Sequence, residues 1–184
     1  MPPKTVRKLA RRTARNKSPS KGIARIKPAK TGVVAGAKAP NFTLPRDGGG
    51  TVSLADFAGR KVVLYFYPRA DTPGCTKEAI EFSRLKAEFS RAGADILGVS
   101  ADPLKALDAF KSKHKITVAL GSDETHKMLA VYGVWQEKLM YGRKFLGIVR
   151  STVLIGPDQR IAQVWPKVTV DGHADEVLAA ARAL

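Results

Sequence analysis

Residues 62–75, which read VVLYFYPRADTPGC, organise the rest of this chain. The apolar run up to Tyr67 is typical of a strand in the middle of a sheet that is covered on both faces. Pro68 ends the run, and the segment 72–74 favours a tight turn. Beyond the turn, apolar side chains recur at spacings of three and four, as on one face of a helix: Ala79, Phe82, Leu85 and Phe89. Cys75 therefore lies where a buried strand passes into a helix.

This position changes what a thiol can do. A helix N-terminus offers unpaired backbone N–H groups and a partial positive charge of roughly half an elementary unit. Both features favour the thiolate, which is the nucleophilic form of cysteine. Thr72, three residues earlier, can offer its hydroxyl to the sulfur or to a bound substrate. A lone cysteine is often only a small buried hydrophobe, but the strand–turn–helix context favours a nucleophile.

Strands and helices alternate along the rest of the chain. The patterns predict a hairpin over 40–44 and 51–54, a helical turn over 53–59, strands over 94–100, 117–120, 148–155 and 160–165, and helices over 75–91 and 123–132. A further helix starts after Asp102-Pro103, with Lys111 on its solvent-exposed side. A last helix follows Asp171. Both aspartates are expected to cap their helices. Residues 135–147 read as a loop. This order predicts an α/β sandwich with a mixed sheet.

The segment Pro68-x-x-x-Thr72-x-x-Cys75 resembles the peroxiredoxin motif, and the longer string over 65–76 resembles the peroxiredoxin Q subfamily, also called bacterioferritin comigratory proteins. Blocks at 132–142 and 147–155 are similar to the later blocks of that subfamily, in the same order. The resemblance runs from about Val33 to the C-terminus and implies a thioredoxin-like fold, which agrees with the predicted α/β order.

The resemblance also implies roles for particular residues. Cys75 would attack the peroxide, Thr72 would hydrogen-bond to it, and Pro68 would shield the sulfur from water. Arg150 matches the active-site arginine, whose guanidinium is always charged and presents several donors. Glu78 is by default an exposed helix residue, but it could orient Arg150.

Trp135 falls within a matched block and could line the pocket, although packing is its default role. The reaction implied is the reduction of hydrogen peroxide or organic hydroperoxides through a Cys75 sulfenic acid. Which peroxide is preferred stays open.

The chain departs from the subfamily at one position. Many peroxiredoxin Q proteins carry a second, resolving cysteine five residues after the first, and that position is Ile80 here. Because the chain has one cysteine, an intramolecular disulfide is impossible. We therefore expect a one-cysteine cycle in which thioredoxin, glutaredoxin or a small thiol resolves the sulfenic acid.

Composition limits the setting of this chemistry. No apolar run approaches the ~20 residues that span a membrane, and the N-terminus shows no hydrophobic signal region. A single cysteine suits a reducing compartment and cannot build a cysteine-based zinc site. We expect a cytoplasmic monomer without metal or cofactor. His114, His126 and His173 read as surface or helix-end residues.

Residues 1–32 read as a disordered basic arm, and residues 33–184 as one domain. Eleven of the 32 Lys and Arg residues lie in residues 1–30, together with none of the 16 Asp and Glu residues. Such an arm can be an inert tail, bind nucleic-acid phosphates, contact an anionic membrane surface, or direct the chain to an organelle as a transit peptide. It contains no aromatic residue, which argues against base stacking.

A competing function belongs to another class, that of a nucleic-acid-binding protein whose thioredoxin-like domain is only a scaffold. The intact set of Pro68, Thr72, Cys75 and Arg150 favours the enzyme, because a scaffold would not need all four. The two functions can also be combined, as a peroxidase that its arm tethers to DNA.

Overall fold

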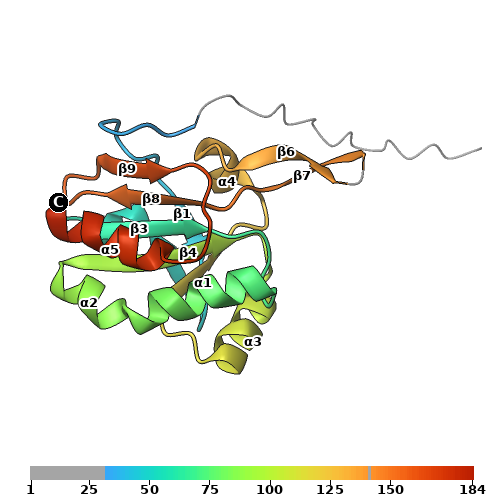
Figure 1. The fold of residues 1–184 in the computed structure, drawn as a ribbon, viewed down its shortest axis with the longest axis horizontal. Coiled ribbons are helices and arrows are strands. Elements are labelled where there is room, and N and C mark those ends of the chain that lie inside the picture. The colour runs from blue at the N-terminus through green and yellow to red at the C-terminus, as the bar shows by residue number, and fades with distance from the viewer. Residues whose placement is uncertain (1–31, 141) are drawn as a thin grey trace, which may run out of the picture.

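A five-stranded mixed sheet forms the centre of the computed structural model, which describes residues 32–140 and 142–184 (Figure 1). The strand order is β5-β4-β3-β8-β9, with β3 at Lys61–Phe66, β4 at Ala94–Ser100, β5 at Ala119–Ser122, β8 at Ser151–Ile155 and β9 at Ile161–Trp165. Strands β3, β4 and β5 run parallel, whereas β8 pairs antiparallel with both β3 and β9. The predicted mixed sheet and the thioredoxin-like α/β fold are confirmed.

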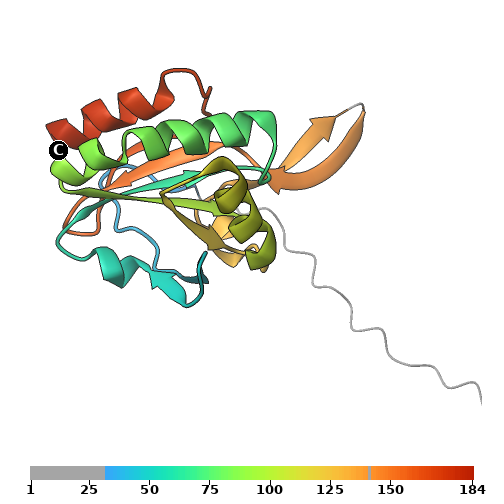
Figure 2. The same ribbon diagram turned by 90° about the horizontal axis from the view of Figure 1, so that it is seen from below.

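Strand β3 is buried on both faces because helices cover one side of the sheet and smaller elements the other. Its residues Val63 and Tyr65 pack with the helices α1 (Pro73–Arg84), α2 (Lys86–Arg91), α3 (Leu104–His114) and α5 (His173–Ala183). Its residues Val62 and Leu64 pack with the hairpin of β1 (Thr43–Pro45) and β2 (Thr51–Ser53), the 3₁₀ turn η1 (Leu54–Phe57) and the helix α4 (Lys127–Val131). Figure 2 shows α1 and α5 above the sheet and the hairpin below it. Each large apolar side chain that is buried stabilises the fold by roughly 1.5–3 kcal/mol. This packing therefore fixes the end of β3 in place.

The predicted helix over 75–91 is two helices. Leu85 breaks it with φ −90° and ψ 1°, and its carbonyl accepts hydrogen bonds from Glu88 and Phe89. The break lets Leu85 and Phe89 both remain buried in the same core. The predicted helix over 123–132 is also shorter, because the Asp123 carboxylate binds the Leu129 N–H and turns the preceding residues out of the helix.

Neither predicted aspartate cap forms. Asp102 precedes α3, but its carboxylate accepts hydrogen bonds from the Ala70 N–H at 2.7 Å and from the Ser100 hydroxyl at 2.9 Å. It therefore ties the segment after β3 to the end of β4. Asp171 instead pairs with Lys77 of α1, and Gly172 at φ +74° precedes α5.

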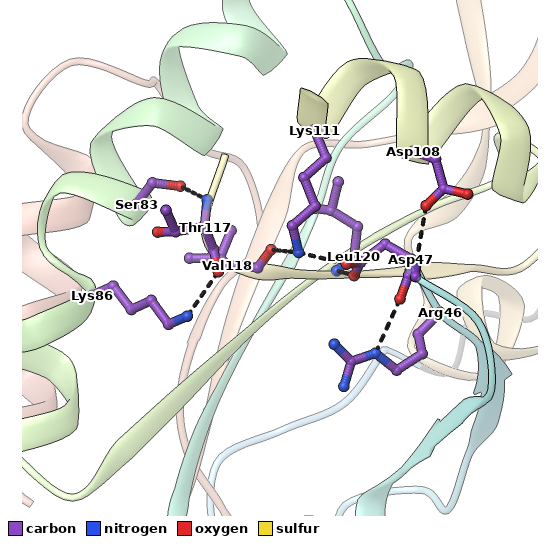
Figure 3. A network of polar contacts seen from close by, with 10 residues as sticks. Arg46, Asp47, Ser83, Lys86, Asp108, Lys111, Thr117, Val118 and Leu120 are labelled. Carbon is purple, nitrogen blue, oxygen red and sulfur yellow. Dashed lines mark hydrogen bonds and ion pairs between the residues drawn. The ribbon is translucent and has the colours of Figure 1, made fainter. Parts of the chain in front are cut away.

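The strand predicted over 117–120 starts two residues later, for a reason visible in Figure 3. The Thr117 N–H donates to Ser83 and its carbonyl accepts from Lys86, so the helix layer holds this residue outside the sheet. Lys111 is not simply a solvent-exposed lysine, because its ammonium lies 2.5 Å from the buried Asp47 carboxylate. Asp47 in turn accepts from the Leu120 N–H at 2.6 Å and covers the free edge of β5.

The loop predicted over 135–147 is a second hairpin, of β6 (Trp135–Met140) and β7 (Arg143–Ile148), which extends away from the body in Figures 1 and 2. The strand predicted over 148–155 is accordingly interrupted. Ile148 ends β7, Ser151 begins β8, and Arg150 lies in the short connection between them.

Among the described residues, no helix is both long enough and apolar enough to cross a membrane. The prediction of a disordered arm falls on residues 1–32, of which 1–31 lie outside the described part of the chain.

Candidate active site

Cys75 is the third residue of α1, with Pro73 at the first helical position and Thr72 just before it. Proline suits this position because the first N–H groups of a helix have no partner inside it. Cys75 is 1% exposed and belongs to the same buried core as Tyr65 of β3 and Tyr67 just beyond the strand. The turn predicted from the sequence thus places a buried sulfur at a helix N-terminus.

Arg150 meets Cys75 from the other side of the site. Its Nη2 atom donates to the Cys75 Sγ at 3.2 Å. The backbone that carries it is held by the Val149 N–H, which donates to Val134 at 2.8 Å, and by the Val168 N–H, which donates to the Arg150 carbonyl at 3.0 Å. A cation that is held in a fixed position beside a sulfur stabilises negative charge on that sulfur.

Gly74 makes the close approach of this guanidinium possible. A Cβ built on Gly74 would lie 3.3 Å from Arg150 Nη2, which is tighter than most Cβ contacts. The glycine in the Thr-Pro-Gly turn therefore serves the site as well as the turn.

Glu78 is buried at 2% exposure, so its default role as an exposed helix residue is wrong. Its Oε2 atom accepts from Arg150 Nη1, while Oε1 has no partner among the described residues. Burial raises the pKa of Glu78 to about 7, and the positive charge of Arg150 opposes that rise. The pKa of Arg150 is also raised: burial would lower it, but Glu78 and the Cys75 sulfur stabilise the cation. Glu78 is placed where it can orient the guanidinium.

Thr72 and Pro68 lie on the segment between β3 and α1. The Thr72 hydroxyl donates to the Arg69 carbonyl at 2.9 Å, which leaves its oxygen lone pairs to accept a further hydrogen bond. Pro68 follows the buried Tyr67 directly and is exposed. In the described structure neither side chain hydrogen-bonds to Sγ, so their predicted roles depend on a bound substrate.

No hydrogen bond joins Trp135 or the three histidines to Cys75 or Arg150 in the described part of the chain. Trp135 stacks on His126 with ring centroids 4.0 Å apart, a packing contact. His114 contacts the Asp71 carboxylate at 2.6 Å. His173 begins α5 but is buried, with its Nε2 atom 2.8 Å from the Thr152 hydroxyl. Burial lowers its pKa, and nearby Arg150 adds to the effect, whereas Glu176 opposes it. Within the described ranges no cluster of three or more acidic, His or Cys side chains could hold a metal ion.

Two residues near the site escaped sequence reasoning. Asp102 looked like a helix cap, and only the fold shows that it binds the Ala70 N–H. Lys138 looked like a loop lysine, but its ammonium donates to the Ile148 carbonyl, two residues from Arg150. Neither interaction has a signal in the local sequence.

Comparison with known proteins identifies the class. Residues 35–164 match the family model described as the AhpC/TSA family. A putative peroxiredoxin Bcp of Coxiella burnetii is 48% identical over 146 residues, covering 79% of this chain and 97% of that protein. Peroxiredoxin Bcp of Xanthomonas campestris is 45% identical over 155 residues, covering 83% and 97%.

Solved structures agree. A structure of the Xanthomonas campestris bacterioferritin comigratory protein, described for its alkyl peroxide reduction activity, has a TM-score of 0.74 at 45% identity and covers 77% of this chain and 90% of its own. The chain thus belongs to the AhpC/TSA family of thioredoxin-like enzymes. Within that family it is a peroxiredoxin of the Bcp, or peroxiredoxin Q, type, and it carries a single cysteine.

Proposed function

We propose that this peroxiredoxin works through Cys75 alone, with an external thiol completing each cycle. The observation that carries the proposal is the 3.2 Å contact between the Arg150 guanidinium and the sulfur of Cys75, which lies at the start of α1. Hydrogen peroxide and organic hydroperoxides are the proposed substrates. The alkyl peroxide reduction reported for the Xanthomonas campestris relative supports the second class.

In the first step the Cys75 thiolate attacks one peroxide oxygen. The S–O bond forms as the O–O bond breaks, and the departing oxygen takes a proton and leaves as water or an alcohol. Negative charge moves from sulfur to the departing oxygen, so fixed donors at that point lower the barrier most. Arg150 supplies them, and the Thr72 hydroxyl oxygen accepts a hydrogen bond from the peroxide O–H. Pro68 limits water at the mouth of the site.

In the second step an external thiol attacks the Cys75 sulfenic acid and releases water, which leaves a mixed disulfide. A second thiol then displaces Cys75 and regenerates it. Ile80 stands where many relatives carry a resolving cysteine, and it is 43% exposed on α1. Thioredoxin, glutaredoxin or a small thiol in a reducing compartment such as the cytoplasm would serve a monomeric enzyme of this kind.

The test of the first step uses the full chain and its Cys75→Ser variant. Each receives one equivalent of hydrogen peroxide together with a sulfenic-acid trap, and intact mass is measured within seconds. A trap adduct on the wild type alone is expected. An unmodified wild-type thiol would refute the proposal.

The second step is tested by supplying single reductants during turnover. Mass spectrometry should then find Cys75 in a mixed disulfide with the supplied thiol. A disulfide between two copies of the chain as the main turnover species would argue against resolution by small thiols.

A further inference from the structure

Lys138 of β6 reaches back toward the base of its hairpin. It faces Phe145 of β7 in the strand register, but its Nζ atom donates to the carbonyl of Ile148, at the end of β7. Its stem passes close to the backbone of β7, since a Cβ built on Gly147 would lie in ordinary van der Waals contact with Lys138 Cδ, at 3.5 Å. The stem of this lysine is partly buried, unlike those of the neighbours on the hairpin that face solvent.

The carbonyl that Lys138 binds belongs to the segment that delivers Arg150 to the sulfur. Residues 148–150 contain no regular hydrogen-bonded structure beyond the end of β7. Ile148 pairs with Trp135 across the hairpin, and the Val149 N–H donates to Val134. The Val168 N–H donates to the Arg150 carbonyl. The Lys138 ammonium adds a side-chain attachment from further along the projecting hairpin.

The charges of the site also act on Lys138. Burial is the largest cause that lowers the pKa of Lys138, the positive charge of Arg150 lowers it further, and the Cys75 sulfur acts in the opposite direction. The ammonium is thus within electrostatic reach of both groups. Lys138 has no carboxylate partner in the part of the chain that the structure describes. Lys144, on the opposite strand, pairs with Glu137 at 2.9 Å.

We propose that Lys138 is a positioning residue for the peroxidase reaction. Its ammonium fixes the backbone ahead of Arg150, so that the guanidinium stays on the Cys75 sulfur. This role rests on the proposed function, in which Cys75 attacks and Arg150 stabilises the charge. The hairpin therefore contributes to the active site although no hydrogen bond joins any of its described residues to the sulfur.

The experiment compares Lys138→Met with Lys138→Arg, and uses Lys144→Met as a matched control on the same hairpin. Two rates are measured on each reduced full-length chain at pH 7: the reaction with hydrogen peroxide, by stopped-flow tryptophan fluorescence, and the alkylation of Cys75 by iodoacetamide. Misplaced catalytic groups and lost charge commonly cost tenfold or more. Lys138→Met should lower both rates about tenfold, Lys138→Arg should restore them to within about threefold, and Lys144→Met should match the wild type.

Wild-type rates in Lys138→Met would overturn the proposal. An equal loss in Lys138→Met and Lys138→Arg would also overturn it, because the shape of the side chain rather than its charge would then be responsible. Circular dichroism establishes that each variant folds, and Lys138→Gln replaces the methionine variant should that one fail. If the wild type does not react with peroxide, the proposed function fails, and the alkylation rates still decide the role of Lys138.

Discussion

Arg150 Nη2 lies 3.2 Å from Cys75 Sγ, although 75 positions separate the two residues in the chain. The other terminal nitrogen of the same guanidinium binds Glu78, one turn of α1 beyond the cysteine. A planar group that is held at both ends cannot rotate away from the sulfur. In the proposed reaction the cation is therefore in place before peroxide binds, and it need not reorganise when charge develops.

Replacing Arg150 should slow the peroxide step sharply. Arg150→Met removes the cation, and the loss of one such donor typically costs 10²–10³-fold in rate. Arg150→Lys should recover only part of the loss, because an ammonium cannot bind Cys75 and Glu78 in the same forked geometry. Stopped-flow rates with hydrogen peroxide measure the effect, and Arg60→Lys, at a surface ion pair with Asp95, is the control. A rate in Arg150→Met within threefold of the wild type would contradict this role.

Glu78 should make stability depend on pH. The folded chain keeps the Glu78 proton up to about pH 7, whereas the ordinary value of 4.5 applies once the chain unfolds. Between these values the folded state binds more protons, so the free energy of unfolding falls as pH rises. Relative to Glu78→Gln, which cannot titrate, the wild type should lose on the order of 2–3 kcal/mol between pH 4.5 and 7.

Urea unfolding of both proteins at several pH values measures this difference. Because glutamine cannot titrate, the slope of the difference reports the titration of Glu78, including the attraction between its ionised form and Arg150. Parallel stability curves for the two proteins would show that Glu78 ionises normally in the folded chain.

Gly74→Ala should separate stability from activity. Alanine is favoured over glycine in a helix by about 0.5–1 kcal/mol, so unfolding should not become easier. The new Cβ would crowd Arg150 Nη2 at 3.3 Å and shift it from the sulfur, which should lower the peroxide rate about tenfold. Gly32→Ala is the control, since nothing lies within 4 Å of a Cβ there. An unchanged rate would mean that the guanidinium moves aside without cost.

Asp102→Ala should loosen the segment between β3 and α1. The variant leaves the partly buried Ala70 N–H and the buried Ser100 hydroxyl without their acceptor, and an unsatisfied buried group costs about 1–3 kcal/mol. The free energy of unfolding should fall by about that amount, and the peroxide rate should fall with it. Asp102→Asn keeps a side-chain oxygen as acceptor and should recover most of both quantities. Equal losses in the two variants would show that the charge of Asp102, rather than its hydrogen bond, matters.

The basic arm gives a prediction that is independent of the site. If residues 1–30 bind phosphate backbones, their deletion should abolish retention on DNA at low salt and leave the peroxide rate unchanged. Affinity of the full chain should fall steeply with salt, because each neutralised phosphate releases counterions. Gel-shift titrations at two salt concentrations measure both effects. Unchanged DNA retention after the deletion would remove support for the tethered peroxidase.

Local features of the chain were predictable wherever one periodicity dominated. The strand β4 has the predicted bounds, and β3 differs by one residue. The hairpin of β6 and β7 was read as a loop because its mixture of lysines and apolar residues gives no clear alternation, and Leu139 is 71% exposed. The two predicted aspartate caps are wrong for another reason. The Asp102 and Asp171 side chains bind groups on other segments instead of capping their own helices.

The sequence by itself determined the strand, the turn and the helix start that place a single cysteine at a helix N-terminus, because turn chemistry and apolar spacing act between near neighbours in the chain. Tertiary structure alone decided that Glu78 is buried, that Arg150 reaches Cys75, and that Lys138 binds the backbone ahead of Arg150. Those contacts depend on the antiparallel insertion of β8 beside β3. The Arg150 cation can lie beside the buried Cys75 sulfur only because packing brings together segments that are distant in the chain. No local sequence pattern encodes that packing.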